Sequence, residues 1–192
     1  SYVPIGNSEY TIEAWIKPYI NGANGIVGWG NYGSTNQANA LRLLEGCPNL
    51  GFRHYWWGND LDICTTNPIN NWYHIVALFD GTSRKIYLDG ELIAADTPNG
   101  HNVPNTNNFK IGSTNNGEYF NGIIDEVKIY NFSLTPEQIR TNYGSGAPTY
   151  KYVNSSETFD NDTWTAQAIP IDDEGLMGDI VEDSLKLSDH NN

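Results

Sequence analysis

The chain has 192 residues, of which 39% are hydrophobic, so it has room for one substantial core, or for one domain plus a fragment. Its 10 basic and 23 acidic side chains give a net charge of −13, which repels phosphate backbones and argues against nucleic-acid binding. No apolar run approaches the roughly 18 residues of a membrane span. Residues 1–10 lack the basic start and apolar stretch of a signal peptide, and we expect Ser1 to be an interior point of a longer chain.

Apolar and polar residues alternate with a period of two along most of the chain, which is typical of half-buried β-strands. The first such stretch is Tyr10–Lys17. Two more, Leu41–Glu45 and Leu50–Tyr55, are separated by the sequence Gly46-Cys47-Pro48-Asn49, which is a turn signal. We therefore expect a hairpin over these two strands.

The middle of the chain predicts an antiparallel meander. Its strands are His74–Phe79, Lys85–Leu88 and Glu91–Ala94, and they are joined by the dipeptides Asp80-Gly81 and Asp89-Gly90. Asp-Gly supplies the positive φ angles that tight hairpins require.

The next segment predicts two more strands and one helix. The strands are Phe109–Gly112 and Gly122–Tyr130, which makes at least eight in all. The sequence Thr135-Pro136-Glu137-Gln138 places a capping hydroxyl first, proline at the first helical position and glutamine at the third. The helix is expected to run to about Tyr143 and to end at Gly144.

A domain boundary is expected near residue 149. Residues 144–149 read as a Gly-Ser-Pro linker, and the net charge changes from −5 over residues 1–149 to −8 over residues 150–192. The segment after the linker holds too few strands to enclose a core, since an immunoglobulin-like sandwich needs about seven. We expect it to be part of a domain that pairs with another chain. Its predicted strands are Tyr150–Val153, Thr163–Ile169 and Asp183–Leu187.

An ordered series of motifs over residues 1–143 resembles the laminin-G-like concanavalin superfamily. The resemblance implies an all-β, antiparallel two-sheet jelly-roll sandwich with one short helix, followed by a linker over 144–149. The tail, with Asp162–Ala166 and Ser184–Leu187, looks like the last strands of an immunoglobulin-like repeat over residues 150–192. Family members usually carry another strand or two before Ser1, so the chain is expected to begin inside one domain and end inside another. The motifs are Tyr10–Pro18, Trp72–Ala77, Ile86–Gly90 and Gly122–Tyr130.

Two features favour an extracellular, glycoprotein setting. Cys47 and Cys64 lie close in sequence and in a secreted protein would form a disulfide, worth about 3 kcal/mol for a loop of this size. The alternative is a pair of buried thiols. Asn-x-Ser/Thr sequons occur at Asn131, Asn154 and Asn161.

The carboxylates do not predict catalysis. Retaining glycoside hydrolysis needs two carboxylates about 5–5.5 Å apart, and the laminarinase-like branch of the superfamily places them on one strand as Glu-x-Asp-x-Glu. Glu118, Asp125 and Glu126 have the wrong spacing, and no Gly-x-Ser-x-Gly nucleophile motif occurs. We expect no enzymatic activity.

Calcium is the expected cofactor, because loops rich in Asn and Asp supply the oxygen ligands that it prefers. In the superfamily an aspartate on the last core strand often anchors a structural calcium, and Asp125 matches that position. Carbonyl ligands are expected from Asn7 or from the Gly28–Asn31 loop. The alternative is an ordinary hydrogen-bonded aspartate at the start of a strand.

The segment His54–Leu61 is the expected ligand site. Sugars present apolar faces beside hydroxyls, so lectin sites pair a flat aromatic ring with amides and carboxylates. Two adjacent tryptophans on a strand face opposite ways, so one is expected in the core and the other outward. The alternative is that both pack inside and that Asn59-Asp60 only makes a turn. The expected binding residues are Tyr32, Arg42, Trp56, Trp57, Asn59 and Asp60.

Two functions follow from these features. The first is an extracellular, non-catalytic adhesion module that binds glycans or glycoproteins as part of a larger surface protein. The second is a structural subunit of an extracellular filament or surface layer, in which copies of the chain pair their strands. A glycoside hydrolase or lyase is the third and least favoured alternative.

Overall fold

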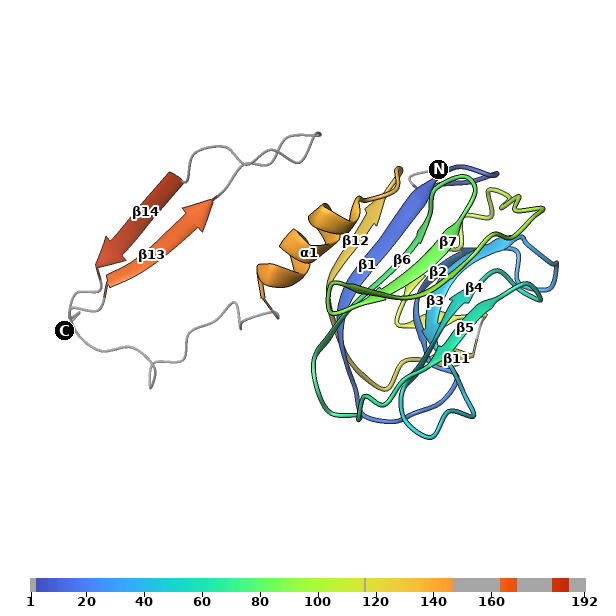
Figure 1. Ribbon diagram of the computed structural model, residues 1–192, viewed down its shortest axis with the longest axis horizontal. Coiled ribbons are helices and arrows are strands. Elements are labelled where there is room, and N and C mark those ends of the chain that lie inside the picture. The colour runs from blue at the N-terminus through green and yellow to red at the C-terminus, as the bar shows by residue number, and fades with distance from the viewer. Residues whose placement is uncertain (1–2, 116, 147–162, 169–180, 187–192) are drawn as a thin grey trace. The chain divides into compact units, whose positions relative to one another are not determined.

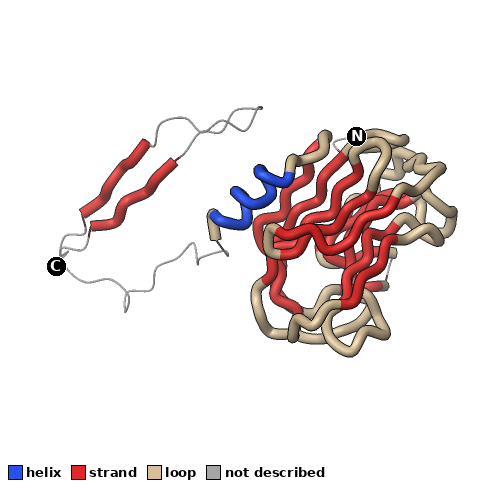
Figure 2. Tube along the Cα trace, viewed as in Figure 1, coloured by secondary structure: helices blue, strands red, loops and turns tan. Residues whose placement is uncertain are grey.

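The computed structural model describes residues 3–115, 117–146, 163–168 and 181–186, and the chain divides into two units, Ser1–Pro148 and Thr149–Asn192. In the first unit, two antiparallel five-stranded sheets face one another as a sandwich (Figure 1). This confirms the all-β, two-sheet prediction. The tube view separates the strands from the helix α1 (Figure 2).

The first sheet contains the predicted meander. Both residues of the Asp89-Gly90 turn take positive φ, at 51° and 80°, as tight hairpins require. The strands lie in the order β12 (Gly122–Tyr130), β1 (Tyr10–Pro18), β6 (Tyr73–Phe79), β7 (Arg84–Leu88) and β8 (Glu91–Asp96).

The second sheet contains the predicted hairpin and two strands that the sequence pattern missed. Its order is β5 (Leu61–Cys64), β4 (Gly51–Tyr55), β3 (Ala38–Leu43), β2 (Gly25–Gly30) and β9 (Lys110–Ile111). The glycines of β2 interrupt the alternation on which the prediction relied, and β5 has only four residues. A short hairpin of β10 (Ser113–Thr114) and β11 (Glu118–Tyr119) follows β9.

Two of the glycines in β2 are required by what packs against that strand. A Cβ atom on Gly25 would overlap the backbone of Thr114, and one on Gly28 would overlap the hydroxyl of Tyr32. The β10–β11 hairpin and Tyr32 therefore lie close against the outer face of the second sheet.

Side chains alternate between the two faces of each strand, and those that face inward form the core between the sheets. Its largest fully buried apolar side chains are Trp29, Trp56, Tyr10, Phe52, Ile12, Ile16, Ile26, Leu41, Leu43, Leu50 and Ile75.

A polar network crosses this core. The Trp56 indole Nε1 donates to the Tyr10 hydroxyl at 2.8 Å, and the Tyr10 hydroxyl lies 2.5 Å from His54 Nε2. The His101 ring stacks on Trp56 with centroids 3.9 Å apart. The Arg84 guanidinium lies 4.3 Å from the centre of the Trp56 ring. The two hydrogen bonds pair polar groups of Trp56, Tyr10 and His54 that would otherwise be costly to bury. Nδ1 of His54 and of His101 has no such partner among the described residues.

The helix α1 (Pro136–Gly144) packs on the outer face of the first sheet. Its amino end has the predicted capping box, in which the Thr135 side chain accepts from Gln138 N and the Gln138 side chain accepts from Thr135 N. Ile139 and Leu134 are buried there against an apolar cluster of Val76, Leu78, Tyr87 and Tyr130. Within the part of the chain that the structure describes, no helix has the length and hydrophobicity to span a bilayer.

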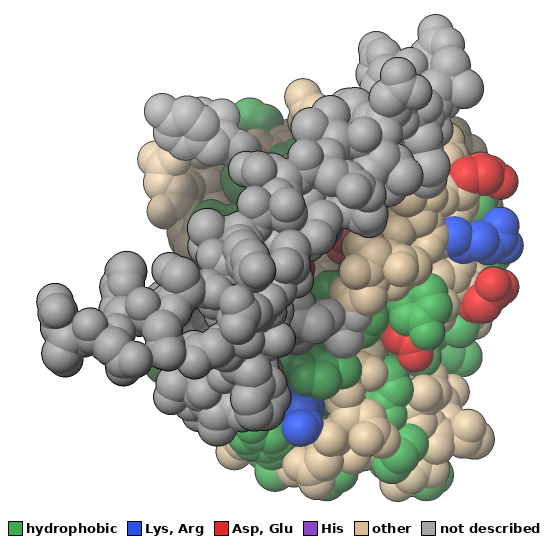
Figure 3. All heavy atoms as spheres, turned by 90° about the vertical axis from the view of Figure 1, so that its left-hand side faces the viewer, with side chains coloured by type: hydrophobic (Ala, Val, Ile, Leu, Met, Phe, Trp, Pro, Cys, Tyr) green, Lys and Arg blue, Asp and Glu red, His purple; other side chains and the backbone are tan. Residues whose placement is uncertain are grey.

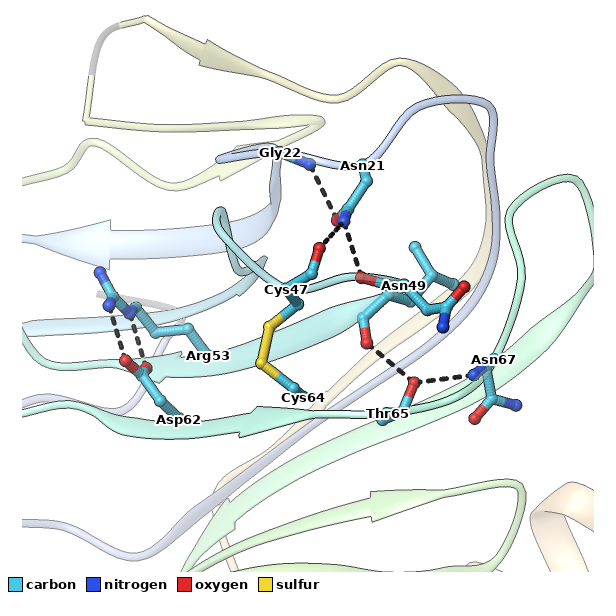
Figure 4. Close-up of a disulfide and its surroundings, with 10 residues drawn as sticks. Asn21, Gly22, Cys47, Asn49, Arg53, Asp62, Cys64, Thr65 and Asn67 are labelled. Carbon is cyan, nitrogen blue, oxygen red and sulfur yellow. Dashed lines mark hydrogen bonds and ion pairs between the residues drawn. A yellow bond between two sulfur atoms is a disulfide. The ribbon is translucent and has the colours of Figure 1, made fainter.

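Cys47 and Cys64 form the predicted disulfide, with Cα atoms 5.5 Å apart (Figure 4). The bond joins the β3–β4 turn to the end of β5. The amide of Asn21 donates to the carbonyl oxygens of Cys47 and Asn49, at 2.9 and 2.6 Å, which fixes the same turn from the other side.

In the second unit, β13 (Thr163–Ala168) pairs antiparallel with β14 (Val181–Lys186). These strands overlap two of the three predicted for the tail. The third, Tyr150–Val153, lies outside the described residues. An immunoglobulin-like fold for residues 150–192 and their pairing with another chain stay predictions.

Removing the disulfide is expected to destabilise the sandwich. The bond closes a loop with a sequence separation of 17, and such loops contribute about 3 kcal/mol. Urea unfolding of a Cys47→Ala/Cys64→Ala double variant should show a correspondingly lower free energy of unfolding. Reductant should lower the stability of the natural chain and leave that of the variant unchanged.

Acid is expected to destabilise the fold through its buried histidines. Burial is the main cause that lowers the pKa of His54, and burial together with the charge of Arg84 lowers the pKa of His101 to about 4. Between the ordinary histidine pKa of about 6.5 and these lowered values, the unfolded chain binds more protons than the folded one. The free energy of unfolding should therefore fall as pH drops from about 6.5 towards 4.

Urea unfolding at a series of pH values measures this loss, and the same series on His101→Gln provides the comparison. The variant lacks one titrating group, so its stability should depend less steeply on pH over that range. Equal slopes for the two proteins would contradict the assignment to His101.

Candidate functional site

Three aromatic side chains gather on the outer face of the second sheet. Tyr55 ends β4, Trp57 follows it in the β4–β5 loop, and Tyr32 follows β2. The Tyr55 ring centroid lies 6.0 Å from that of Tyr32 and 5.8 Å from that of Trp57, and the third pair is 6.4 Å apart. We call Tyr32, Tyr55 and Trp57 the aromatic trio.

Small residues under the trio let it lie close to the sheet. Ala40 on β3 pairs with Gly28 on one side and Tyr55 on the other. The Tyr32 hydroxyl lies against Gly28, where any side chain would overlap it.

Arg42 borders the trio from β3, with only 3% of its surface exposed. Its guanidinium lies 4.6 Å from the centre of the Tyr55 ring, which is cation–π distance. It is paired with Glu45 at 3.1 Å and with Glu118 of β11. Glu118 also accepts a hydrogen bond from Thr114, so the β10–β11 hairpin is tied to this face.

Arg53 lies on β4, opposite Arg42 in the register of the two strands. It makes a two-pronged pair with Asp62, with N–O distances of 2.7 and 2.6 Å (Figure 4), and lies 3.8 Å from Asp60 Oδ2. Its guanidinium is 5.8 Å from the Tyr55 ring centre. Tyr55 therefore lies beside two arginines, which are opposite one another in the register of β3 and β4 and are each paired with carboxylates.

Two buried polar atoms at this site have no hydrogen-bond partner among the described residues: the Tyr32 hydroxyl and the Arg42 Nε. Burial, with a smaller effect from Glu118, raises the pKa of Tyr32 and raises that of Tyr55 to about 12. Both hydroxyls thus keep their proton at neutral pH. The site offers aromatic faces, hydroxyl groups and carboxylate acceptors within one patch.

The structure brings together four of the six residues predicted for the ligand site. Tyr32 and Trp57 belong to the trio, and Arg42 borders it. Asp60 lies at the border beside Arg53, and its carboxylate accepts from Trp56 N at 2.9 Å.

The Asn59 side chain is hydrogen-bonded to two other loops. Its amide donates to Asn36 Oδ1 at 2.6 Å and to the Asn99 carbonyl at 3.4 Å.

The prediction that Trp56 binds the ligand is wrong. Its side chain is 0% exposed and is covered by His101 and Arg84, so no face is free to stack on a ligand. The two tryptophans do separate into one core and one outward residue, because Trp57 adopts a φ of 63° and leaves the strand there.

Tyr55, Arg53 and Glu118 join the site although the sequence did not single them out. The alternation of β4 does contain the signal, since Arg53 and Tyr55 share the face opposite to the core residues Phe52 and His54. Glu118 had no comparable signal, because its position depends on how the β10–β11 hairpin folds back.

The predicted calcium ligands Asp125 and Asn7 do not converge. Asp125 is paired with Trp15 of β1. Trp15 is five residues, or roughly 16 Å, along the strand from Tyr10, and Asn7 lies before Tyr10 at the other end of that strand. Asp125 instead accepts a hydrogen bond from Glu126 N at 2.8 Å. The described residues contain no group of three or more His, Cys, Asp or Glu side chains placed to hold a metal. Calcium binding at Asp125 stays a prediction, and Asn7 is not among the ligands expected there.

Of the predicted glycosylation sites, Asn131 is exposed after the end of β12. Asn154 and Asn161 lie outside the described residues. Glycosylation stays a prediction at all three.

Residues 1–140 match the family described as the concanavalin A-like lectin/glucanases superfamily, under its Laminin_G_3 member. No curated protein matches the chain significantly.

Several solved structures share the fold. Domain 4 of AbnA, an extracellular arabinanase from Geobacillus stearothermophilus solved with arabinotriose, has a TM-score of 0.57 at 22% identity, covering 72% of this chain and 67% of that one. A putative carbohydrate-binding protein from Bacteroides ovatus has a TM-score of 0.56 at 24% identity, covering 72% of this chain but only 41% of that one. The Ruminococcus gnavus sialidase module CBM40, bound to sialyllactose, has a TM-score of 0.57 at 19% identity, with coverages of 71% and 83%.

Proposed function

Because this chain belongs to the concanavalin A-like lectin/glucanases superfamily, we propose that its first unit is a non-catalytic module that binds carbohydrate on the outer face of the second sheet. The aromatic trio is the observation that carries this proposal. Flat rings of Tyr and Trp pack against the C–H faces of sugar rings, and neighbouring polar groups fix the hydroxyls. Proteins of similar fold have been solved in complex with arabinotriose and with sialyllactose, which supports the ligand class.

The charges around the trio favour a neutral oligosaccharide. Arg42 is already paired with Glu45 and Glu118, and Arg53 with Asp60 and Asp62. Four carboxylates thus surround two guanidinium groups, which leaves the patch net negative. An acidic sugar would have to displace these pairs, whereas the hydroxyls of a neutral sugar can donate to the carboxylates.

The strained backbone at Trp57 supports a role in binding. A bulky residue at φ 63° costs roughly 1 kcal/mol, and such costs persist where function requires the side chain in that position. Here the conformation places the indole beside Tyr55 and Tyr32.

We place the module outside the cell, as part of a larger surface protein. The disulfide between Cys47 and Cys64 supports this, because such bonds persist in oxidising compartments. The partners are then glycans or glycoproteins. A filament or surface-layer subunit remains the second proposal, which depends on the pairing of residues 150–192 with a neighbouring chain.

Replacing Trp57 with glycine is expected to separate binding from stability. Glycine adopts φ 63° without strain, so the variant should be at least as stable as the natural chain, while its loss of an aromatic face should weaken glycan binding by about tenfold or more. A glycan array on the intact module identifies the ligand, and calorimetry on the variant measures the loss.

Phe132→Ala is the matched control, because Phe132 is an exposed aromatic residue that packs on Tyr130 of the other sheet. Its affinity should equal that of the natural chain. Unchanged affinity in Trp57→Gly, or no ligand on the array at millimolar sensitivity, would refute the proposed site.

We also propose calcium as a structural ion at Asp125. A ligand that binds only the folded chain raises its stability, so a chelator should lower the melting temperature. The Asp125→Asn variant should show no response to chelator. Identical melting of the natural chain with and without chelator would exclude the ion.

A further inference from the structure

A second pocket lies on the opposite sheet, at the carboxyl end of α1. Its volume is about 460 Å³, and it belongs to the outer face of the first sheet, whereas the aromatic trio lies on the second sheet. Its lining residues are Trp15, Trp72, Asp89, Tyr143, Gly144 and Gly146.

Three aromatic rings form the walls and floor of this pocket. Trp15, which is almost fully buried, stacks with Tyr143 with ring centroids 5.9 Å apart. Tyr143 is 39% exposed. Trp72 makes no hydrogen bond or ring contact with any residue in the described part of the chain, and its partly exposed indole is therefore free to receive a ligand.

A carboxylate lies among these rings. Asp89 Oδ1 accepts from the backbone N–H of His74 at 2.9 Å, and its other oxygen has no hydrogen-bond partner among the described residues. No lysine or arginine of the described chain pairs with it, and burial raises its pKa. A partly buried carboxylate gains from pairing with a cation, and the free oxygen of Asp89 is available for it.

The end of α1 adds negative charge to the same place. The last carbonyl groups of a helix carry about half a negative charge together, and a basic residue in the last turn commonly offsets it. The last turn of α1 has none. Gly144 and Gly146, which line the pocket, lie at this helix end.

The other charged groups nearby compensate one another. The His74 ring, 5.3 Å from that of Trp15, has its Nε2 3.3 Å from Glu13 Oε1. Glu13 is also held by Lys128 at 2.9 Å. His74 also favours the charged form of Asp89, but burial is the larger effect and raises the pKa of this carboxyl.

We propose that this pocket binds an organic cation, with the ammonium group over the faces of Trp72 and Tyr143 and beside the free oxygen of Asp89. Aromatic faces attract cations most strongly when the site also excludes water, and alkylated ammonium groups are the cations that such pockets take. The source is either a free quaternary ammonium compound or a methylated lysine of a partner protein. In Figure 3, the part of this face that the grey atoms leave visible shows hydrophobic side chains (green) beside acidic (red) and basic (blue) ones.

The test is titration of the full chain with choline, followed by tryptophan fluorescence and calorimetry. 3,3-Dimethyl-1-butanol, which has the shape of choline without the charge, is the matched ligand control. We expect saturable millimolar binding of choline and at least tenfold weaker binding of the alcohol. Trp72→Ala and Asp89→Asn should each weaken choline binding at least fivefold, while Trp57→Gly should leave it unchanged.

Equal binding of the alcohol would overturn the cation assignment, and no saturable choline binding by the natural chain would overturn the site. Circular dichroism of each variant establishes that it is folded. Asp89→Asn preserves size and shape, so it tests the charge even where Trp72→Ala unfolds. A trimethyllysine peptide that binds at least tenfold more tightly than choline would identify a protein partner as the source, and the reverse order would identify a free compound.

Discussion

The placement of Arg84 inside the sandwich is the constraint on which the surface of the aromatic trio depends. Its guanidinium is fully buried, pairs with Asp96 at 2.5 and 3.0 Å, and lies over the Trp56 ring. It also donates to the Asn59 carbonyl at 2.5 Å. One side chain of the first sheet thus holds the loop that leaves the second sheet. Arg84 thus holds the Trp56 ring in the core and the Asn59 backbone in the loop. Trp57 lies between these two fixed residues, and its side chain therefore faces outward.

The same outer face depends on residues that are notable for lacking side chains. Gly25 and Gly28 allow Thr114 and Tyr32 to approach the backbone of β2, and Thr114 and Arg42 both hold Glu118. A larger residue at Gly28 would lift Tyr32 away from Tyr55 and break the trio. The site is therefore built by close approach to a flat sheet, with arginine–carboxylate pairs at its border that keep the rings in position.

The sequence predicted the parts of this fold that alternation and turn chemistry control. The meander of β6, β7 and β8, the capping box of α1 and the pairing of Cys47 with Cys64 follow local rules. Alternation cannot identify a strand such as β2, whose outward residues are glycines. It was also unable to decide which of Trp56 and Trp57 faces the core, since that depends on Arg84, which lies over 20 residues further along the chain. Glu118 and Trp72 entered their sites through tertiary placement for which no local pattern exists.

The two candidate sites differ in how their charges are balanced, and this difference predicts what each accepts. Around the aromatic trio every arginine has a carboxylate partner, so a ligand there gains most from ring stacking and hydroxyl hydrogen bonds. Beside α1, a carboxylate and a helix carboxyl end face aromatic rings, and no lysine or arginine of the described residues lines that pocket. A positive charge would suit all three of these groups together. Aromatic rings on two faces of one sandwich are therefore expected to select different ligands, because the carboxylates beside them are paired with arginines at one site and not at the other.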